Sequence, residues 1–221
     1  MKILGLIFIL VFLGLMIFFT VQSRRKRFGP LRDIPAFNRL RRSVGLSVES
    51  GNRLHLSLGR GDLTSTQSAV AFVGLSALAR IARATSVSDR PPVATSGDGS
   101  ITILTQDTLR TASRRYGGQY DPMSGRLTGV TPYSYAAGTL SIIHDGDVSA
   151  NVLLGSFGSE VALINEAGER AGSLTLAGTD NVAAQSVIFA SAHEPLIGEE
   201  TYASGAYLGV GRMHVASLHA Q

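Results

Sequence analysis

The chain has 221 residues, 25 glycines, no cysteine and a formal net charge of +4. The absence of cysteine excludes disulfides, thiolate nucleophiles, zinc ribbons and iron–sulfur clusters, and so many glycines argue against a helical bundle. Residues 43–221 contain eleven arginines and fifteen acidic residues, which gives this part a net charge of −4. An acidic domain binds nucleic acid poorly, so we expect no nucleic-acid partner.

Residues 3–21 form a stretch without charge or proline. At about 1.5 Å per residue, these nineteen residues nearly match a hydrocarbon core of roughly 30 Å, which predicts a transmembrane helix. A cleaved signal peptide is the alternative, but Lys2 alone is a weak basic region and no small-residue cleavage site follows. A buried core helix would rarely be so uniformly apolar.

Four consecutive basic residues, Arg24, Arg25, Lys26 and Arg27, follow this stretch, and only Lys2 precedes it. Cationic flanks of a membrane helix stay in the cytoplasm. We therefore expect a protein of the cell membrane with its N-terminus outside and the rest of its chain in the cytoplasm. The basic residues should also attract anionic lipid headgroups, at about 1 kcal/mol each.

The chain is thus expected to have three parts. The first is an anchor at residues 1–23, and the second is a basic stalk at 24–43 with Phe37 and Leu40 as its contacts to the domain. Residues 44–221 are long enough for one soluble domain with a core of its own.

Within the domain, alternating apolar residues on both sides of Gly51 and Asn52 predict a β-hairpin over residues 44–58. Caps, prolines and apolar periodicity predict the elements that follow. Strands are expected at 93–95, 127–130, 148–154 and 173–177, and helices at 69–83, 100–116, 131–146, 159–167, 182–190, 196–208 and 211–220.

A strand, a glycine-containing turn and a capped helix recur about four times, which is typical of βαβ units. We therefore predict an α/β domain with a mostly parallel sheet, helices on both faces and the hairpin at its start. Two alternatives stay open. Ile101 and Ile103 could pair with Val93 across a turn in place of the helix at 100–116, and residues 161–176 could form a hairpin in an α+β domain.

Four segments carry a resemblance to a known family: LHLSLGRG at 54–61 after a basic stalk, YAAG at 135–138, LLGSFGSE at 153–160 and LIGEE at 196–200. They resemble an uncharacterised family of bacterial single-pass membrane proteins that share a domain of unknown function. The resemblance covers nearly the whole chain. It implies the membrane topology, and it implies no activity, substrate or catalytic residue.

Several signatures of catalysis and cofactor binding are missing from the sequence. There is no G-x-x-x-x-G-K-[ST], no G-x-G-x-x-G at a strand-to-helix turn, no G-x-S-x-G and no H-E-x-x-H. His214 and His219 are five residues apart, which does not suit a helical metal pair, and we interpret His55, His144 and His193 as structural. We expect no cofactor and no metal.

The turns after three predicted strands are the candidate binding site. In a parallel sheet these turns share the carboxyl edge, where ligands bind. Their glycines expose backbone N–H groups, which suits a small polar molecule or a peptide carbonyl, whereas their carboxylates disfavour a polyphosphate. The candidate residues are Ser96, Gly97, Asp98, Gly155, Ser156, Gly158, Glu160, Gly178, Thr179 and Asp180.

The same residue types are also what ordinary turns and helix caps require, so a purely structural role is the alternative for each turn. If the turns bind a ligand, Val at Gly155 or Gly158 should abolish binding at a modest cost in stability, provided that φ is negative there.

Two functions follow. The favoured one is a membrane-tethered binding or scaffolding module on the cytoplasmic face, with a protein partner or a small polar ligand. The other is an enzyme of unidentified type that acts on a small polar substrate at the carboxyl edge. Buried, convergent Asp98, Glu160 or Asp180 side chains would favour the enzyme. Side chains that cap their own helices would favour the binding module.

Overall fold

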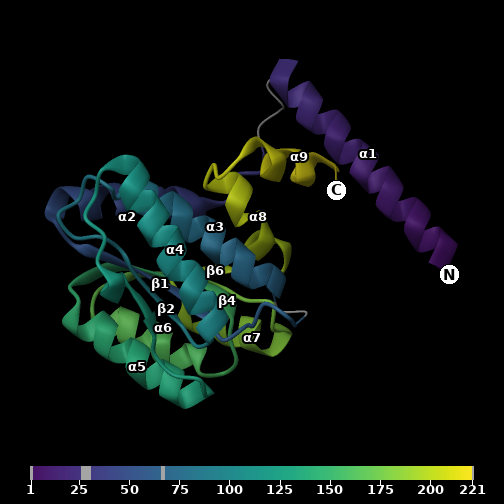
Figure 1. Ribbon diagram of the computed structural model, residues 1–221. Coiled ribbons are helices and arrows are strands. Elements are labelled where there is room, and N and C mark those ends of the chain that lie inside the picture. Colours follow the sequence, from purple (N-terminus) through teal and green to yellow (C-terminus); the bar gives the residue numbers. More distant parts are fainter. Residues whose placement is uncertain (1, 26–30, 66–67, 221) are drawn as a thin grey trace.

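Six strands form one fully parallel sheet in the order β3-β2-β1-β4-β5-β6. The computed structural model describes residues 2–25, 31–65 and 68–220 (Figure 1). The strands are β1 Arg53–Gly59, β2 Val93–Ser96, β3 Gly125–Leu127, β4 Val148–Ser156, β5 Leu174–Gly178 and β6 Glu194–Leu196.

Helices cover both faces of this sheet. The helices of the chain are α1 Lys2–Arg25, α2 Pro35–Ser50, α3 Ser68–Ala84, α4 Gly99–Tyr116, α5 Pro132–Asp145, α6 Val161–Arg170, α7 Val182–Ser191, α8 Glu199–Tyr207 and α9 Arg212–Ala220, with the short 3₁₀ helix η1 at Pro122–Ser124. One core lies beneath α2, α3 and α4, and the other lies beneath α5, α6 and α7. Figure 1 shows α3 and α4 on one side of the sheet and α5 and α6 on the other. This strand order and this division of helices define the doubly wound Rossmann architecture, so the α/β prediction is confirmed.

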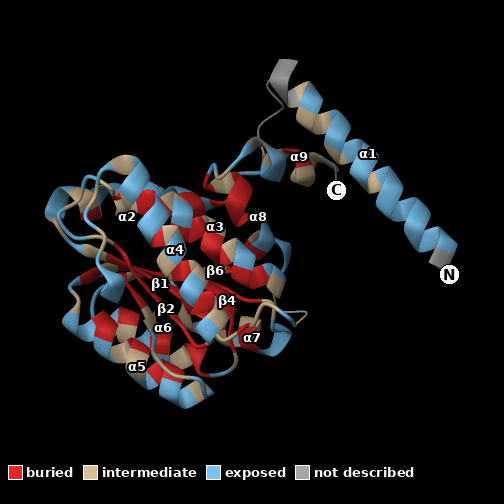
Figure 2. Ribbon diagram, viewed as in Figure 1, coloured by how far each residue is buried: buried red, intermediate tan, exposed pale blue. Residues whose placement is uncertain are grey.

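The central strand β1 explains the two cores. Leu54, Leu56 and Leu58 point into the core beneath α2–α4, and each is at most 2% exposed. His55 and Ser57 alternate with them, point to the α5 side and are fully buried. Figure 2 shows the central strands β1, β2 and β4 as a buried layer between the helices.

The predicted hairpin over residues 44–58 is wrong. Residues up to Ser50 belong to α2, and Gly51 ends this helix with a left-handed backbone at φ 69°. β1 then enters the middle of the sheet and pairs in parallel with β2 and β4. Gly51 and Asn52 signalled a change of direction correctly, but a glycine with positive φ serves a helix C-cap as well as a hairpin turn.

Both alternative hairpins are also absent, because helices occupy those residues. Asp98 caps α4 by accepting hydrogen bonds from the backbone N–H groups of Ser100 and Ile101, and α6 spans residues 161–170. The predicted helix at 196–208 begins later than expected. Residues 194–196 form the short edge strand β6, and α8 starts after Gly198, whose φ is 60°.

The segment before the domain is fixed to the end of the chain by a set of contacts that we call the α2–α8 clamp. Arg32 and Arg39 form ion pairs with Glu200 and Glu194. The ring of Phe37 stacks on that of Tyr207 with centroids 5.0 Å apart. Phe37 and Leu40 are each 1% exposed in the core. α2 runs across residues 43–44, where the stalk was expected to meet the domain.

α1 lies apart from the sheet. Residues Ile3–Gln22 have a mean hydropathy of 2.9, and none of them is buried. Arg24 and Arg25 close this helix, whereas Lys26 and Arg27 lie outside the described residues. α9 runs beside α1 (Figure 1), and the rings of Phe19 and His219 have centroids 6.3 Å apart.

Candidate functional site

The ten predicted residues all lie at or just after the ends of strands at the carboxyl edge of the sheet, in three turns that are not all adjacent. They lie at β2, β4 and β5, and β1 separates β2 from β4. Adjacent strands are about 4.8 Å apart, so the turns after β2 and β5 are separated by roughly 14 Å. The loop that lies between the predicted turns is the one after β1.

This β1 loop begins at the point where the chain order of the sheet reverses. After β1 the chain enters α3 on one face, and after β4 it enters α6 on the other. Ligands of doubly wound sheets bind in the crevice at such a switch point. Backbone hydrogen bonds join the strand ends here, since Arg60 N–H donates to Ser156 O over 2.9 Å and Gly97 N–H donates to Gly59 O over 2.8 Å.

Arg60 fills the switch point with its own side chain. Its Nε donates to Oε1 of Glu160 over 3.2 Å, and that carboxylate also accepts from Gly158 N–H over 3.0 Å. Glu160 is only 2% exposed. A Cβ added at Gly97 would lie 2.4 Å from Cγ of Arg60, so Gly97 provides the space over which this side chain passes. Arg60 therefore links the β2 turn to the β4 turn.

The other predicted polar side chains mostly bind their own turns. Asp98 caps α4, and the Ser96 hydroxyl donates to the backbone oxygen of Asp98 over 3.0 Å. The hydroxyl of Thr179 accepts from Phe157 N–H over 3.1 Å, which joins the turns after β4 and β5. The N-cap of α7 is Asn181, the residue that follows the predicted Asp180. Structural roles therefore account for most of the polar atoms in these turns.

Beneath the switch point lies a network of buried polar groups on the α5 side of the sheet. His55 bonds through Nδ1 to Asn151 Oδ1 at 2.6 Å and through Nε2 to Thr95 Oγ1 at 2.9 Å. The Tyr135 hydroxyl lies 2.5 Å from Ser57 Oγ and accepts from the backbone N–H of Gly59 over 3.2 Å.

Burial dominates the titration of this network. It lowers the pKa of His55 to about 4, against a smaller opposing effect of the Asn151 hydrogen bond. Burial also raises the pKa of Tyr135 above its ordinary value of 10. His55 is therefore neutral near pH 7, and the prediction that it is structural is confirmed by its two hydrogen bonds.

The expectation that Val at Gly155 would cost little stability is wrong. Gly155 lies inside β4, and a Cβ at this position would be 1.9 Å from the backbone oxygen of Leu58. Backbone atoms of β1 cannot move aside cheaply. At Gly158 the nearest atom is Oε2 of Glu160 at 2.6 Å, so a side chain there would meet the Arg60–Glu160 pair.

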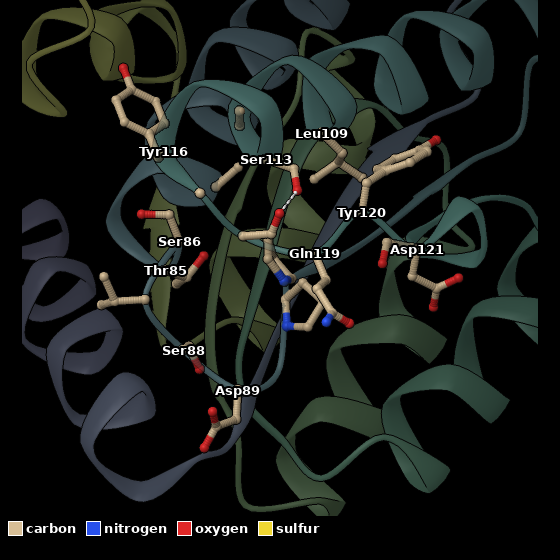
Figure 3. Close-up of a pocket in the computed structure, with 18 of the residues that line it drawn as sticks. Thr85, Ser86, Ser88, Asp89, Leu109, Ser113, Tyr116, Gln119, Tyr120 and Asp121 are labelled. Carbon is tan, nitrogen blue, oxygen red and sulfur yellow. Dashed lines mark hydrogen bonds between the residues drawn. The ribbon is translucent and has the colours of Figure 1, made fainter.

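A cavity of about 680 Å³ lies at the opposite, amino edge of the sheet. It is bounded by Arg53 at the start of β1, by the loop 85–92 before β2 and by the loop 117–124 before β3. Figure 3 shows Thr85, Ser86 and Ser88 on one side of this space, and Leu109 and Tyr120 on the other. None of these residues belongs to the predicted set.

The comparison with protein families gives one result. The sequence profile described as "Domain of unknown function (DUF6754)" matches residues 1–221. The chain belongs to this family. No curated protein and no solved structure matches it.

For this DUF6754 chain, chemistry must therefore be judged from its own residues. In the part of the chain that the structure describes, no three His, Asp or Glu side chains lie close enough to hold a metal ion. Arg60 lies outside the predicted set because β1 was expected to be part of a hairpin. The signal that could have revealed it is the run from Leu54 to Gly61, an alternating strand that ends in Gly-Arg-Gly and is followed by a helix.

Proposed function

We propose that this DUF6754 chain is a bacterial single-pass membrane protein whose α/β domain is a binding or scaffolding module on the cytoplasmic face. The observation that carries the proposal is α1. Its 20-residue apolar span is long enough to cross a bilayer, and the domain buries none of it. Exposing an apolar surface of this size to water is unfavourable, so the surface is expected to be covered. The length of the helix matches the thickness of a lipid bilayer.

The junction between anchor and domain supports the same proposal. The α2–α8 clamp ties the segment after the basic run to the C-terminal part of the domain. Whatever the domain binds is therefore held at the surface of the membrane. Arg24, Arg25, Lys26 and Arg27 keep the N-terminus outside and the domain in the cytoplasm, and they lie against anionic headgroups.

Membrane insertion has a consequence for α9. In the structure His219 of α9 lies beside Phe19, which belongs to the apolar span of α1. In a bilayer, lipid would cover the surface of the apolar span that α9 contacts here. We therefore propose that lipid replaces α9 on α1 when the span is inserted.

A binding role is favoured over an enzymatic one because the polar side chains of the carboxyl edge are occupied. Asp98 caps α4 and Glu160 is paired with Arg60. Within this proposal the ligand site is the switch point. A small polar ligand with a carbonyl or carboxylate oxygen would compete with Glu160 for Arg60, whose side chain is 28% exposed.

The topology is tested with reporters fused after Gln221 of the full chain. A reporter that is active only in the cytoplasm should give signal, and a phosphatase that is active only outside the inner membrane should not. Changing Arg24, Arg25, Lys26 and Arg27 together to Gln should weaken or invert this result.

The matched control changes four exposed domain arginines, Arg110, Arg114, Arg115 and Arg170, to Gln. It removes the same charge far from the span and should leave the orientation unchanged. An active phosphatase on the wild-type chain, or a protein released from membranes by alkaline carbonate, would refute the proposed anchor and its orientation.

A further inference from the structure

The cavity at the amino edge of the sheet is a site that the proposed function does not use. Its volume of about 680 Å³ lies within the usual range of roughly 300–1,000 Å³ for small-molecule pockets. It lies at the amino ends of β1, β2 and β3, whereas the switch point is at their carboxyl ends. Whatever binds here is therefore independent of Arg60 and Glu160.

The walls of the cavity are held in place by hydrogen bonds of their own. Ser113 of α4 donates to Gly118 O over 2.6 Å, the dashed contact in Figure 3. On the opposite wall Ser88 N–H donates to Thr85 O over 3.0 Å. The two loops approach each other where a Cβ on Gly118 would be 3.3 Å from Ser86 O. The space is preformed, because each loop is fixed independently of any ligand.

Arg53 is the unusual residue of the lining. Its Nε is buried and has no hydrogen-bond partner, and its guanidinium forms no ion pair with any residue that the structure describes. The neighbouring Arg90, by contrast, donates to Asp147 over 2.7 Å. Buried donors are normally satisfied, and a charged donor without a partner costs more than a neutral one.

Charged groups of both signs surround Arg53. Burial has the largest effect and lowers the pKa of its guanidinium, Arg90 and Arg126 lower it further, and Asp121 and Asp147 raise it. Arginine stays protonated even so. Because no ion pair with a described residue neutralises the guanidinium, the position favours a negatively charged group beside Arg53.

Other features limit that negative charge to one. Asp89 and Asp121 also line the cavity. The C-terminal ends of α3 and α4, which carry partial negative charge, point to the same edge. A polyphosphate would be repelled by these groups, whereas a single carboxylate would neutralise the guanidinium of Arg53.

The remaining wall is apolar and contains flat surfaces. Pro92, Leu109, Ala112, Tyr116 and Tyr120 are among the residues that line the cavity. Arg83 and Arg115 lie over the ring of Tyr116, 5.2 and 5.8 Å from its centroid. A ring compound could pack against these side chains with its acid group toward Arg53.

We propose that the amino-edge cavity binds a small aromatic or cyclic monocarboxylate, with the carboxylate on Arg53 and the ring against Leu109, Pro92 and the tyrosines. This site lies beyond the proposed function, and it depends on neither the anchor nor the switch point. It gives the membrane-facing module a ligand of defined chemistry.

The test uses 4-fluorobenzoate and the full chain in lipid nanodiscs, with empty nanodiscs to measure partition into lipid. Binding is followed by broadening of the ¹⁹F resonance, and we expect saturation with a Kd of about 1 mM or tighter. The neutral isostere 4-fluorobenzamide should bind at least about tenfold more weakly, because it cannot pair with Arg53.

Two variants locate the site. Arg53→Gln removes the cation and Ser86→Phe places a ring in the cavity, and each should weaken 4-fluorobenzoate binding at least about tenfold. Arg110→Gln removes the same charge from an exposed position outside the lining and should bind like the wild type.

Thermal unfolding of each variant shows that its fold is retained. If 4-fluorobenzoate fails to saturate the wild type, or if Arg53→Gln binds it unchanged, the proposal is wrong. The reporter assay of the topology is unaffected by either result, so a failure of this site and a failure of the anchor can be told apart.

Discussion

At the carboxyl edge of the sheet Arg60 is paired with the buried Glu160, and at the amino edge Arg53 has no partner among the described residues. Both arginines flank the same strand, β1, one at its start and one just after its end. The first edge has short turns whose polar atoms bind one another. The second has two longer loops that leave a cavity between them.

The comparison teaches where unsatisfied groups arise. Gly, Ser, Thr and Asp mark turns in a sequence, but a turn uses these residues for its own hydrogen bonds. A side chain remains available to a ligand where a loop is longer than a tight turn needs to be. Segments 85–92 and 117–124 are such loops, and neither was predicted from the sequence to be part of a binding site.

The largest effect is expected at the carboxyl edge, where β1 and β4 are in closest contact. Gly155→Val should destabilise the protein by at least about 4 kcal/mol or prevent folding, because its Cβ would overlap Leu58 O. Chemical denaturation followed by circular dichroism measures this. Gly99→Ala is the control, since a Cβ there meets nothing within 4 Å, and its midpoint should not fall. If Gly155→Val were as stable as the wild type, the backbone of β1 would be able to move aside, and the carboxyl edge would not be more rigid than the amino edge.

The second prediction concerns the buried network between the two edges. His55 has a pKa of about 4 when folded and about 6.5 when unfolded. As pH falls below about 6.5 the unfolded chain binds a proton that the folded chain does not, so the free energy of unfolding decreases down to about pH 4 and then levels off. The total loss is on the order of 3 kcal/mol.

In His55→Gln most of this pH-dependent loss of unfolding free energy should disappear. The quantity to measure is the slope of the unfolding free energy against pH, because the substitution also changes stability at any single pH. His144→Gln, at an exposed position, is the control and should keep the wild-type slope. An unchanged slope in His55→Gln would mean that the network admits a proton and is less closed than its hydrogen bonds indicate.

The smallest effects compare the two arginines directly. Arg60→Gln leaves the carboxylate of Glu160 buried without its cation and should cost about 2 kcal/mol, less than a fully buried pair because Arg60 is partly exposed. Arg53→Gln removes no ion pair or hydrogen bond with a described residue, and the lost repulsion from Arg90 and Arg126 offsets the lost attraction to Asp121 and Asp147, so stability should change by less than about 0.5 kcal/mol. Equal losses in the two variants would mean that Arg53 has a structural partner after all.

Local signals explain what could be predicted from the sequence. Thr131 and Ser134 form a capping box at the start of α5, and Asp98 caps α4, so the predicted starts of these helices are close to the observed ones. Such caps depend on residues within one turn of each other. The repeated strand–turn–helix pattern then identified the parallel sheet.

The wrong predictions concern segments whose secondary structure is decided by tertiary contacts. Residues 44–50 alternate like a strand, but α2 extends through them because its Phe37 and Leu40 are buried in the core. With α2 mistaken for a hairpin, β1 could not be placed at the centre, and Arg60 could not be placed between the β2 and β4 turns. The cavity at Arg53 was equally out of reach, since it depends on two loops that are adjacent only in the folded chain.

The shortness of the connection between α1 and the α2–α8 clamp has a further consequence. Residues 26–31 separate Arg25, the last residue of α1, from Arg32, the first residue of the clamp. Even fully extended, six residues cover only roughly 20 Å. If α1 is inserted in a bilayer as we propose, the domain would be confined to a thin layer above the lipid, where it would meet partners in the same membrane by lateral diffusion at high effective concentration. Contacts too weak to persist between freely diffusing molecules would suffice there.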